Sequence, residues 1–251
     1  MSKKIKKVLL KKNKQKIVCL TAYSKNIAKV LDKYCDIILV GDSMANVLYG
    51  MKNTNQITID NIIQHSMSVK QGVKNSLLVI DMPRKTCKNL IKAKKNAKMI
   101  LKKTRCDAVK VESNNKNFNI IKGLVKSNIP VMGHIGYTPQ FKKRFKVEGK
   151  NKIEEKKLIK EACLIEKAGA FSIVLECITP TVAKKITSIL KIPTIGIGSS
   201  AYCDGQILVT DDILGLSGFY PRFVKRYINL KTIIEKAVKK YSKEIKTKVS
   251  N

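Results

Sequence analysis

The sequence predicts a single (β/α)8 barrel, the TIM-barrel class of α/β fold, and three observations carry this prediction. Eight short apolar runs alternate with longer segments of helical period, which is typical of a parallel sheet. Nearly every run ends in polar residues, and a barrel brings all eight such ends to one mouth, whereas a doubly wound sheet uses only a few. The 251 residues contain no low-complexity linker, so we expect one domain over residues 1–251.

The expected elements follow from hydrophobic period. The strands are Lys16–Ala22, Asp36–Gly41, Leu77–Asp81, Ala108–Glu112, Val131–His134, Ser172–Glu176, Thr194–Gly198 and a less clear one near Leu208–Leu214. The helices between them are Asn26–Lys33, Asp60–Gln71, Lys88–Lys103, Asn119–Lys126, Ile153–Lys167 and Thr181–Leu190. A basic N-terminal segment (about residues 1–15) precedes the barrel, and a C-terminal helix (about residues 230–248) follows it.

The net charge is +33, from 51 basic and 18 acidic residues. Such a charge raises the question of nucleic-acid binding. Phosphate and base recognition favours the arginine fork, yet only five of the basic residues are Arg, and the lysines are spread over nearly every helical segment. We therefore expect a solvated basic surface and no specific nucleic-acid partner, with nucleic-acid binding kept as an alternative.

Apolar runs and cysteines indicate the compartment. No apolar run approaches the roughly 20 residues that span a bilayer, and the apolar run Val8–Leu10 is too short for a secretory signal. The seven cysteines are scattered and form no CxxC pair, which favours a reducing environment. The expectation is a cytoplasmic protein without a membrane segment.

Four acidic residues end apolar strands: Asp42, Asp81, Glu112 and Glu176. Any one of them is also explained as a helix cap. Four carboxylates at one barrel mouth would repel each other unless a cation lay among them. The chain has only two histidines and no cysteine pair with metal spacing, so hard oxygen ligands favour Mg²⁺ over zinc.

Other strand-end residues are candidates for the same site. Lys110 lies two residues before Glu112 and shares its inward face, where it either compensates charge or holds a substrate carboxylate. The apolar run before Glu176 favours a raised pKa and a role as base, with an ion pair to Lys110 as the alternative. His134 sits at a strand end and is a further candidate, whereas His65 lies mid-helix and is expected to pack. The Gly196–Ser199 turn is either an anion cradle or room for a ligand.

The chain resembles the ketopantoate hydroxymethyltransferase family over nearly its whole length. Nine stretches carry the resemblance in the order in which the family has them: Thr21–Tyr23, Leu39–Ser43, Asp81–Pro83, Val109–Glu112, Gly133–Gln140, Phe145–Lys150, Val174–Cys177, Ile192–Gly198 and Cys203–Val209.

The resemblance implies a barrel of the phosphoenolpyruvate/pyruvate type and a reaction. A one-carbon unit passes from 5,10-methylenetetrahydrofolate to 3-methyl-2-oxobutanoate through a Mg²⁺-stabilised enolate, giving 2-dehydropantoate for pantothenate and coenzyme A synthesis. By motif match, Asp42, Asp81 and Glu112 are metal ligands, Glu112 directly or through water. Asp42, Ser43, Asp81, Lys110 and, less firmly, His134 bind the 2-oxo acid, and Glu176 is the catalytic base.

The resemblance also implies a homo-oligomer, a decamer in this family. The Lys142–Lys150 segment is rich in charge and contains a glycine, and we expect it to act as a lid that excludes water. Three places depart from the usual family pattern: Ser24 after Thr21–Tyr23, the Arg84–Cys87 stretch after Pro83, and the pair Ser113 and Asn114 after Glu112. These changes remove no proposed ligand and concern loop geometry and folate contacts. The alternatives are another Mg²⁺-dependent 2-oxo-acid lyase or mutase barrel, or a basic nucleic-acid-binding protein on a barrel scaffold.

Overall fold

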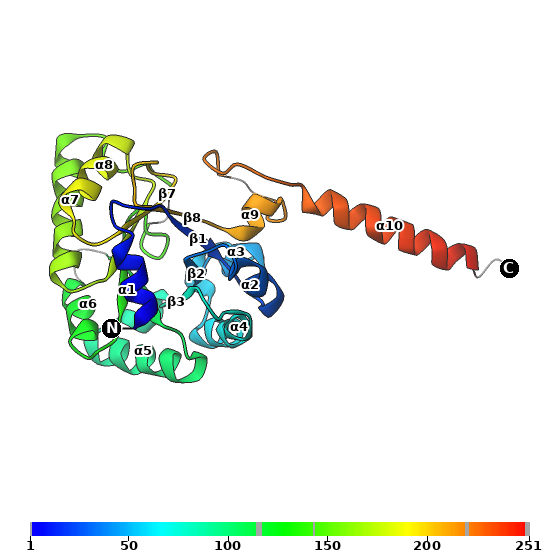
Figure 1. The fold of residues 1–251 in the computed structure, drawn as a ribbon, viewed down its shortest axis with the longest axis horizontal. Coiled ribbons are helices and arrows are strands. Elements are labelled where there is room, and N and C mark those ends of the chain that lie inside the picture. Colours follow the sequence, from blue (N-terminus) through cyan, green and yellow to red (C-terminus); the bar gives the residue numbers. More distant parts are fainter. Residues whose placement is uncertain (1, 114–116, 143, 219–220, 249–251) are drawn as a thin grey trace. The chain divides into compact units, whose positions relative to one another are not determined.

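A computed structural model describes residues 2–113, 117–142, 144–218 and 221–248. Eight parallel strands close into a barrel in chain order, which confirms the predicted fold class (Figure 1). The closure is completed where the Ile17 N–H donates to the Asp204 carbonyl at 2.9 Å. The strands are β1 Ile17–Thr21, β2 Ile37–Val40, β3 Leu77–Asp81, β4 Ala108–Glu112, β5 Val131–Gly136, β6 Ser172–Glu176, β7 Thr194–Ile197 and β8 Gly205–Leu208.

Helices follow most strands and cover the outside of the barrel. They are α2 Lys25–Leu31, α3 Met44–Val47, α4 Ile59–Gly72, α5 Leu90–Thr104, α6 Phe118–Val125, α7 Lys152–Lys167 and α8 Pro180–Ile189, with 3-10 turns η1 Thr54–Gln56 and η2 Arg84–Cys87. Local sequence determines where they begin. The Asn151 side chain accepts the Glu154 N–H at 2.9 Å and caps α7, and Thr58 with Asn61 forms a capping box at α4.

The basic N-terminal segment forms a helix, α1 (Lys3–Leu10), to which the sequence pattern assigned no element. Ser2 caps it, and Ile5 and Val8 are buried in one apolar cluster with Ile17 and Ile37. Residues 17 and 37 begin their strands, so α1 closes the N-terminal end of the barrel. The sequence signal for this helix was weak because only a narrow apolar stripe among the lysines faces the barrel.

The eighth strand lies earlier than predicted. β8 spans Gly205–Leu208, and Thr210–Leu214 forms a helix, α9, so the expectation of a strand near Leu208–Leu214 was wrong. Asp211 and Asp212 lie in the first turn of α9, where their negative charges interact favourably with the positive end of the helix dipole. Gly215 caps the C-terminal end of the helix with a φ of 75°. Gly205 is required in the strand because a Cβ there would meet the Ile17 carbonyl at 2.6 Å.

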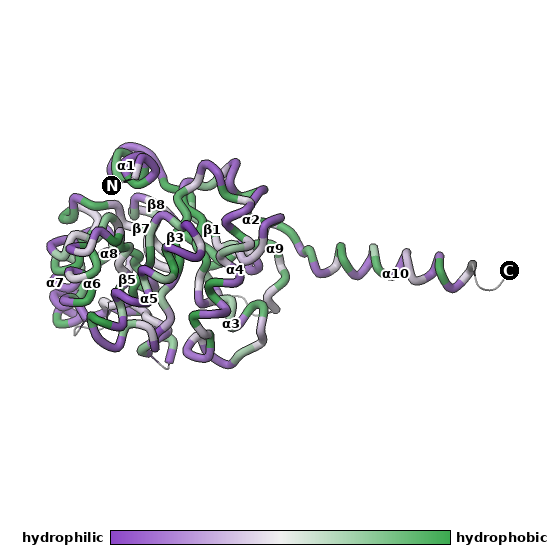
Figure 2. The backbone as a smooth tube through the Cα atoms, turned by 90° about the horizontal axis from the view of Figure 1, so that it is seen from below, coloured by the Kyte–Doolittle hydropathy of each residue, from purple (hydrophilic) through white to green (hydrophobic). Residues whose placement is uncertain are grey.

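The chain divides into two compact units, Met1–Ile207 and Leu208–Asn251. The first holds almost the whole barrel and all the predicted site residues. The second contains α9 and α10 (Leu230–Lys248), which occupies the range predicted for the C-terminal helix. Figure 2 shows hydrophobic and hydrophilic residues alternating along α10. One domain over the whole chain stays a prediction. In the described part of the chain, no helix is long and apolar enough to cross a membrane.

Candidate active site

The inward-facing positions of the strands change from apolar to charged along the barrel axis. In β3, Leu77 and Val79 belong to the buried cluster beneath α1, and Asp81, the next residue on that face, lies at the C-terminal end. In β4, Ala108 is followed on the same face by Lys110 and Glu112. This period-two alternation fills the lower barrel with apolar side chains and leaves the mouth for the charged ones.

Asp42 and Asp81 form a tight pair at this mouth. Asp81 Oδ2 accepts the backbone N–H of Asp42 at 3.0 Å, and both side chains are at least 95 % buried. Gly41 allows the approach, because a Cβ at that position would lie 2.9 Å from Ser43 Oγ and 3.5 Å from Asp81 Oδ2. Burial and the neighbouring Asp81 carboxylate raise the pKa of Asp42 to about 7, against the opposing effect of Lys110.

Lys110 is the positively charged residue beside the Asp42–Asp81 pair. Its Nζ lies 2.9 Å from Asp81 Oδ1 and 3.3 Å from His134 Nδ1. Burial lowers the pKa of Lys110, but the carboxylates of Asp81, Glu112 and Asp42 outweigh burial and raise it, so the ammonium keeps its proton. The ion pair of Lys110 is therefore with Asp81, and Glu176 contacts His134.

His134 connects the lysine to Glu176. Burial and the Lys110 charge lower the pKa of His134 well below its ordinary value, so the ring is neutral. An ammonium can only donate, so Nδ1 accepts from Lys110 and Nε2 carries the ring proton. Nε2 lies 3.2 Å from Glu176 Oε2 without an aligned hydrogen bond, which leaves a buried donor directed at the mouth.

Glu176 ends β6 and is the least buried of the site carboxylates, with 17 % of its side chain exposed. Burial raises the pKa of Glu176 to about 8 even though Lys110 lowers it. Its backbone is held by Gly136, which has a φ of 92° and packs so closely that a Cβ would overlap the Glu176 carbonyl. A raised pKa at an accessible carboxyl suits a proton-transfer role near neutral pH.

Glu112 is turned toward β5 and the loop beyond it. Its Oε2 accepts the Gln140 N–H at 3.0 Å, and its Oε1 lies 3.7 Å from His134 Nδ1. Burial and Asp42 raise the pKa of Glu112 well above its ordinary value. The structure thus brings Asp42, Asp81, Lys110, Glu112, His134 and Glu176 together, with Ser43 directly beside them; the individual roles stay predictions.

Two side chains with no role assigned from the sequence also belong to this site. Gln140 Nε2 donates to Asp42 Oδ2 at 2.9 Å and to the Met82 carbonyl at 3.1 Å, so one residue braces Asp42 and, through its N–H, Glu112. The Tyr23 hydroxyl lies 2.8 Å from Ser43 Oγ. Gln140 was missed because it follows β5 by four residues, and an uncharged amide has no strand-end signature.

His65, the other histidine, lies outside the site in α4. Its Nδ1 lies 2.8 Å from the Tyr23 carbonyl and its Nε2 lies 2.9 Å from the Tyr49 hydroxyl. At the seventh strand, the Ser199 hydroxyl is buried without a partner among the described residues, and the role of the Gly196–Ser199 turn stays a prediction.

The residues present fit a magnesium ion. No group of three or more acidic, histidine or cysteine side chains is gathered closely enough to hold a metal among the described residues. Mg²⁺, however, usually takes one or two protein carboxylates and completes its shell with water and substrate oxygens. Asp42 and Asp81 are two such buried carboxylates, and Asp81 Oδ1 has no aligned hydrogen bond beside its ion pair.

The segments that depart from the usual family pattern follow strands at the mouth of the barrel. Arg84–Cys87 form η2, and Arg84 stacks over the Phe141 ring at 5.3 Å. Ser24 precedes α2 without a side-chain capping bond, and Asn114 lies outside the described residues.

The Lys142–Lys150 segment suggested as a lid is anchored near both ends. At its start, Lys142 Nζ donates to the Gly136 carbonyl at 2.7 Å. The Glu148 N–H donates to the Cys177 carbonyl at 2.8 Å. The Glu148 carboxylate also forms an ion pair with Lys142, with 2.9 Å between Oε1 and Nζ. Lys143 lies outside the described residues.

A closed parallel barrel with a carboxylate–lysine–histidine mouth defines a (β/α)8-barrel enzyme. Its fold is similar to that of the solved phosphoenolpyruvate phosphomutase from Streptomyces platensis subsp. rosaceus, with a TM-score of 0.66 over 97 % of this chain and 87 % of that one, at 11 % identity. At that identity the likeness concerns the fold alone.

The particular family follows from the sequence. The model of the family Ketopantoate hydroxymethyltransferase matches residues 3–249, and the chain belongs to this family. It is 52 % identical to the 3-methyl-2-oxobutanoate hydroxymethyltransferase of Pelagibacter ubique (strain HTCC1062), over 98 % of this chain and 95 % of that protein. It is 45 % identical to the enzyme of the same name from Anaplasma marginale (strain St. Maries), over 94 % and 86 %.

Proposed function

We propose that this chain catalyses the 3-methyl-2-oxobutanoate hydroxymethyltransferase reaction of pantothenate biosynthesis, with 5,10-methylenetetrahydrofolate as one-carbon donor and 2-dehydropantoate as product. The observation that carries the proposal is the division of the mouth into two sides in a chain of this family. Asp42, Asp81 and Lys110 form a charged binding side, and His134 with Glu176 forms a proton-transfer side.

Asp42 and Asp81 would hold the Mg²⁺, with Glu112 joining directly or through water. Burial and repulsion from Asp81 raise the pKa of Asp42 to about 7, so a bound cation would offset the electrostatic cost of the two buried carboxylates that Lys110 alone leaves uncompensated. When bound, the metal supplies Lewis acidity toward the carboxylate and keto oxygens of the 2-oxo acid.

The side chains of the protein bind the substrate and transfer the proton. Lys110, fixed by Asp81, and the Ser43 hydroxyl hold the 2-oxo acid. The Nε2 proton of His134 is free to hydrogen-bond a substrate oxygen or the Glu176 carboxylate. Glu176 takes the proton from C3 of the oxo acid, and C3 then forms a bond to the one-carbon unit. Both bonds of that carbon to folate nitrogens break, a water molecule supplies the hydroxyl oxygen of the product, and tetrahydrofolate leaves with the C3 proton and one water proton on its nitrogens. Glu176 serves as the base because its apolar setting raises its pKa to about 8.

We also propose that the protein acts in the cytoplasm as a homo-oligomer, a decamer as in the family, without a specific nucleic-acid partner. α10 supports self-association, because Ile234, Val238, Tyr241 and Ile245 recur at helical spacing and form one apolar stripe. The seven cysteines are free, which fits a reducing compartment. Multi-angle light scattering after gel filtration tests the oligomer: a monomer at micromolar concentration contradicts it.

The test of the activity is 2-dehydropantoate formation from 3-methyl-2-oxobutanoate and 5,10-methylenetetrahydrofolate, with Mg²⁺ and after chelation. We expect product only with the metal. A folded protein that forms no product in either condition contradicts the proposal. Salt-sensitive RNA binding that survives Asp42→Asn, in a protein without turnover, would favour the nucleic-acid alternative.

A further inference from the structure

A tight turn after β5 carries Gln140 into the mouth of the barrel. The N–H groups of Phe141 and Lys142 both donate to the Thr138 carbonyl at 2.9 Å, which closes the turn. Thr138 and Gln140 are buried, although β5 itself ends at Gly136. The turn is therefore part of the packed wall of the mouth, and Gln140 lies at its tip.

Three hydrogen bonds connect Gln140 to three other segments of the mouth. Its backbone N–H donates to Glu112 Oε2 at 3.0 Å. Its side-chain Nε2 donates to Asp42 Oδ2 at 2.9 Å and to the Met82 carbonyl at 3.1 Å. Asp42 follows β2, Met82 follows β3 and Glu112 ends β4. One residue beyond β5 thus ties together the ends of the three preceding strands.

The chemistry of these bonds requires an amide at position 140. The Met82 carbonyl can only accept, so the side-chain atom that faces both it and Asp42 is the nitrogen, and each of its two protons has one acceptor. A glutamate at this position could make neither bond in its ionised form. Among the residues that the structure describes, only Oδ2 of Asp42 accepts a hydrogen bond, so Oδ1 keeps its lone pairs for a cation.

We propose that Gln140 is a positioning residue for the metal site, which holds Asp42 and Glu112 in the arrangement in which they bind Mg²⁺. This inference rests on the proposed function, which assigns the metal to these carboxylates. A hydrogen-bonded partner fixes the orientation of a ligating carboxylate before the metal arrives, so less conformational freedom is lost on binding. Gln140 acts through Asp42, and its effect is therefore on the affinity for the metal and not on the proton transfer at Glu176.

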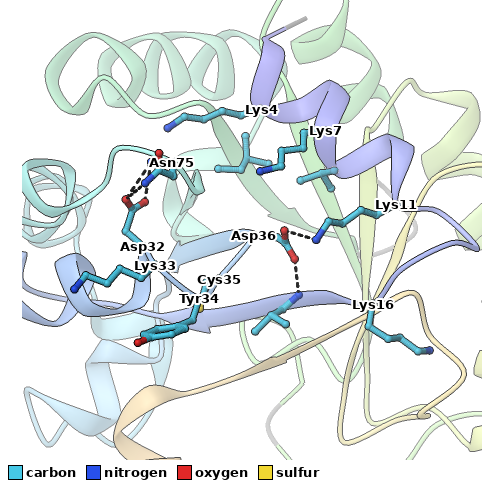
Figure 3. Close-up of a pocket in the computed structure, with 13 residues that line it drawn as sticks. Lys4, Lys7, Lys11, Lys16, Asp32, Lys33, Tyr34, Cys35, Asp36 and Asn75 are labelled. Carbon is cyan, nitrogen blue, oxygen red and sulfur yellow. Dashed lines mark hydrogen bonds and ion pairs between the residues drawn. The ribbon is translucent and has the colours of Figure 1, made fainter.

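A similar hydrogen bond at the other end of the barrel provides a matched control. The Asn75 amide donates to Asp32 Oδ2 at 3.0 Å in a polar cavity that is lined in part by α1 (Figure 3). Asn75 precedes β3, which begins at Leu77, whereas Asp81 ends that strand at the mouth. Loss of the Asn75 amide therefore removes the same kind of bond without reaching the carboxylates of the mouth.

Isothermal titration calorimetry with Mg²⁺, in the absence of the oxo acid and folate, tests the proposal. The test variant is Gln140→Met and the control is Asn75→Leu, and each replaces an amide by an apolar side chain of similar size. Gln140→Asn, which keeps the amide but is one methylene shorter, is measured as well, so that the test holds if Gln140→Met does not fold. Circular dichroism and thermal melting establish which variants are folded.

The dissociation constant for Mg²⁺ should rise by about 10-fold to 100-fold in the Gln140 variants, the usual effect of losing a partner of a metal ligand. In Asn75→Leu it should stay within about twofold of the wild-type value, because the two sites are distant. The Mg²⁺ concentration that gives half-maximal formation of 2-dehydropantoate should rise by the same factor as the dissociation constant, whereas kcat at saturating Mg²⁺ is largely retained.

A folded Gln140 variant with wild-type affinity for Mg²⁺ overturns the proposal even if its melting temperature has fallen, because the amide then serves only the fold. An equal weakening of Mg²⁺ binding in Asn75→Leu also overturns it. A wild-type chain that binds no Mg²⁺ contradicts the metal site of the proposed function as well, so the two failures are distinguishable.

Discussion

His134 lies between the lysine and the base: its Nδ1 is 3.3 Å from Lys110 Nζ and its Nε2 is 3.2 Å from Glu176 Oε2. The ring is neutral and its tautomer is set by the ammonium, so the Nε2 proton faces the carboxyl that is to act as base. The charged and proton-transfer sides of the mouth are thus connected through a single imidazole.

Replacing Glu176 by Gln keeps the size of the side chain and removes the base. We expect kcat to fall by about 10²-fold to 10⁴-fold, the usual contribution of a positioned base, while binding of the oxo acid is retained. Glu161→Gln on α7 is the matched control and leaves kcat within about twofold. Steady-state kinetics with both variants makes the comparison; a Glu176→Gln enzyme with wild-type kcat would remove Glu176 from the mechanism.

The pH dependence of kcat/KM follows from the same carboxyl. Burial raises the pKa of Glu176 to about 8, and only the deprotonated form accepts a proton. We expect kcat/KM to rise by about tenfold per pH unit from pH 6 and to level off near pH 8. An activity that is flat between pH 6 and pH 8 would contradict this, provided that the protein remains folded throughout.

The pH dependence of the free energy of unfolding is an independent test of the raised pKa of Glu176. A carboxyl whose pKa is raised on folding binds a proton in the native state that the unfolded chain has lost, so its stabilising effect is complete below about pH 4.5 and is lost as pH rises toward 8. The free energy of unfolding of the wild type, relative to Glu176→Gln, should fall by up to about 1.4 kcal/mol per pH unit in this window. Denaturant unfolding at pH 5 to 8 measures it, and two parallel profiles would refute it.

Asp42→Asn tests the metal side of the mouth. Because burial and Asp81 raise the pKa of Asp42, the neutral amide should stabilise the metal-free protein at pH 8 and abolish turnover. The rise in melting temperature on adding Mg²⁺ should be present in the wild type and lost in the variant. Asp60→Asn on the exposed side of α4 is the control and keeps the rise. A Mg²⁺ shift that persists in Asp42→Asn would exclude Asp42 as a ligand.

Gly136→Ala should disturb the site through the backbone. A methyl group there overlaps the Glu176 carbonyl in addition to requiring a φ of 92°. Gly50→Ala is the matched control, since Gly50 also has positive φ but meets nothing within 4 Å. The control should cost about 1–2 kcal/mol of unfolding free energy, and Gly136→Ala should cost more. Equal losses in denaturant unfolding would mean that the contact with Glu176 is unimportant.

The barrel and the site carboxylates were predictable because period-two alternation and strand-end polarity are local signals. Asp81, Lys110, Glu112 and Glu176 all lie on inward positions that the pattern itself indicates. Features that depend on distant contacts were not predictable in this way. Examples are the partnership of Lys110 with Asp81 across two strands and the double contact of Gln140 with Asp42 and Glu112.

The ends of the chain were harder for a different reason. α1 shows only a narrow apolar stripe among lysines, and its burial against Ile17 and Ile37 appears only once the barrel has closed. Around Leu208, apolar residues suggested a strand, but Asp211 and Asp212 favour a helix start, and this local preference prevails in α9.

The central claim is that Glu176 takes the C3 proton of 3-methyl-2-oxobutanoate, and hydrogen exchange tests it most directly. Proton NMR in D₂O, with Mg²⁺ and without folate, follows loss of the C3 signal of the oxo acid. We predict enzyme-dependent exchange in the wild type, no exchange above the uncatalysed rate in Glu176→Gln, and normal exchange in Glu161→Gln. Exchange at the wild-type rate in Glu176→Gln would contradict the claim.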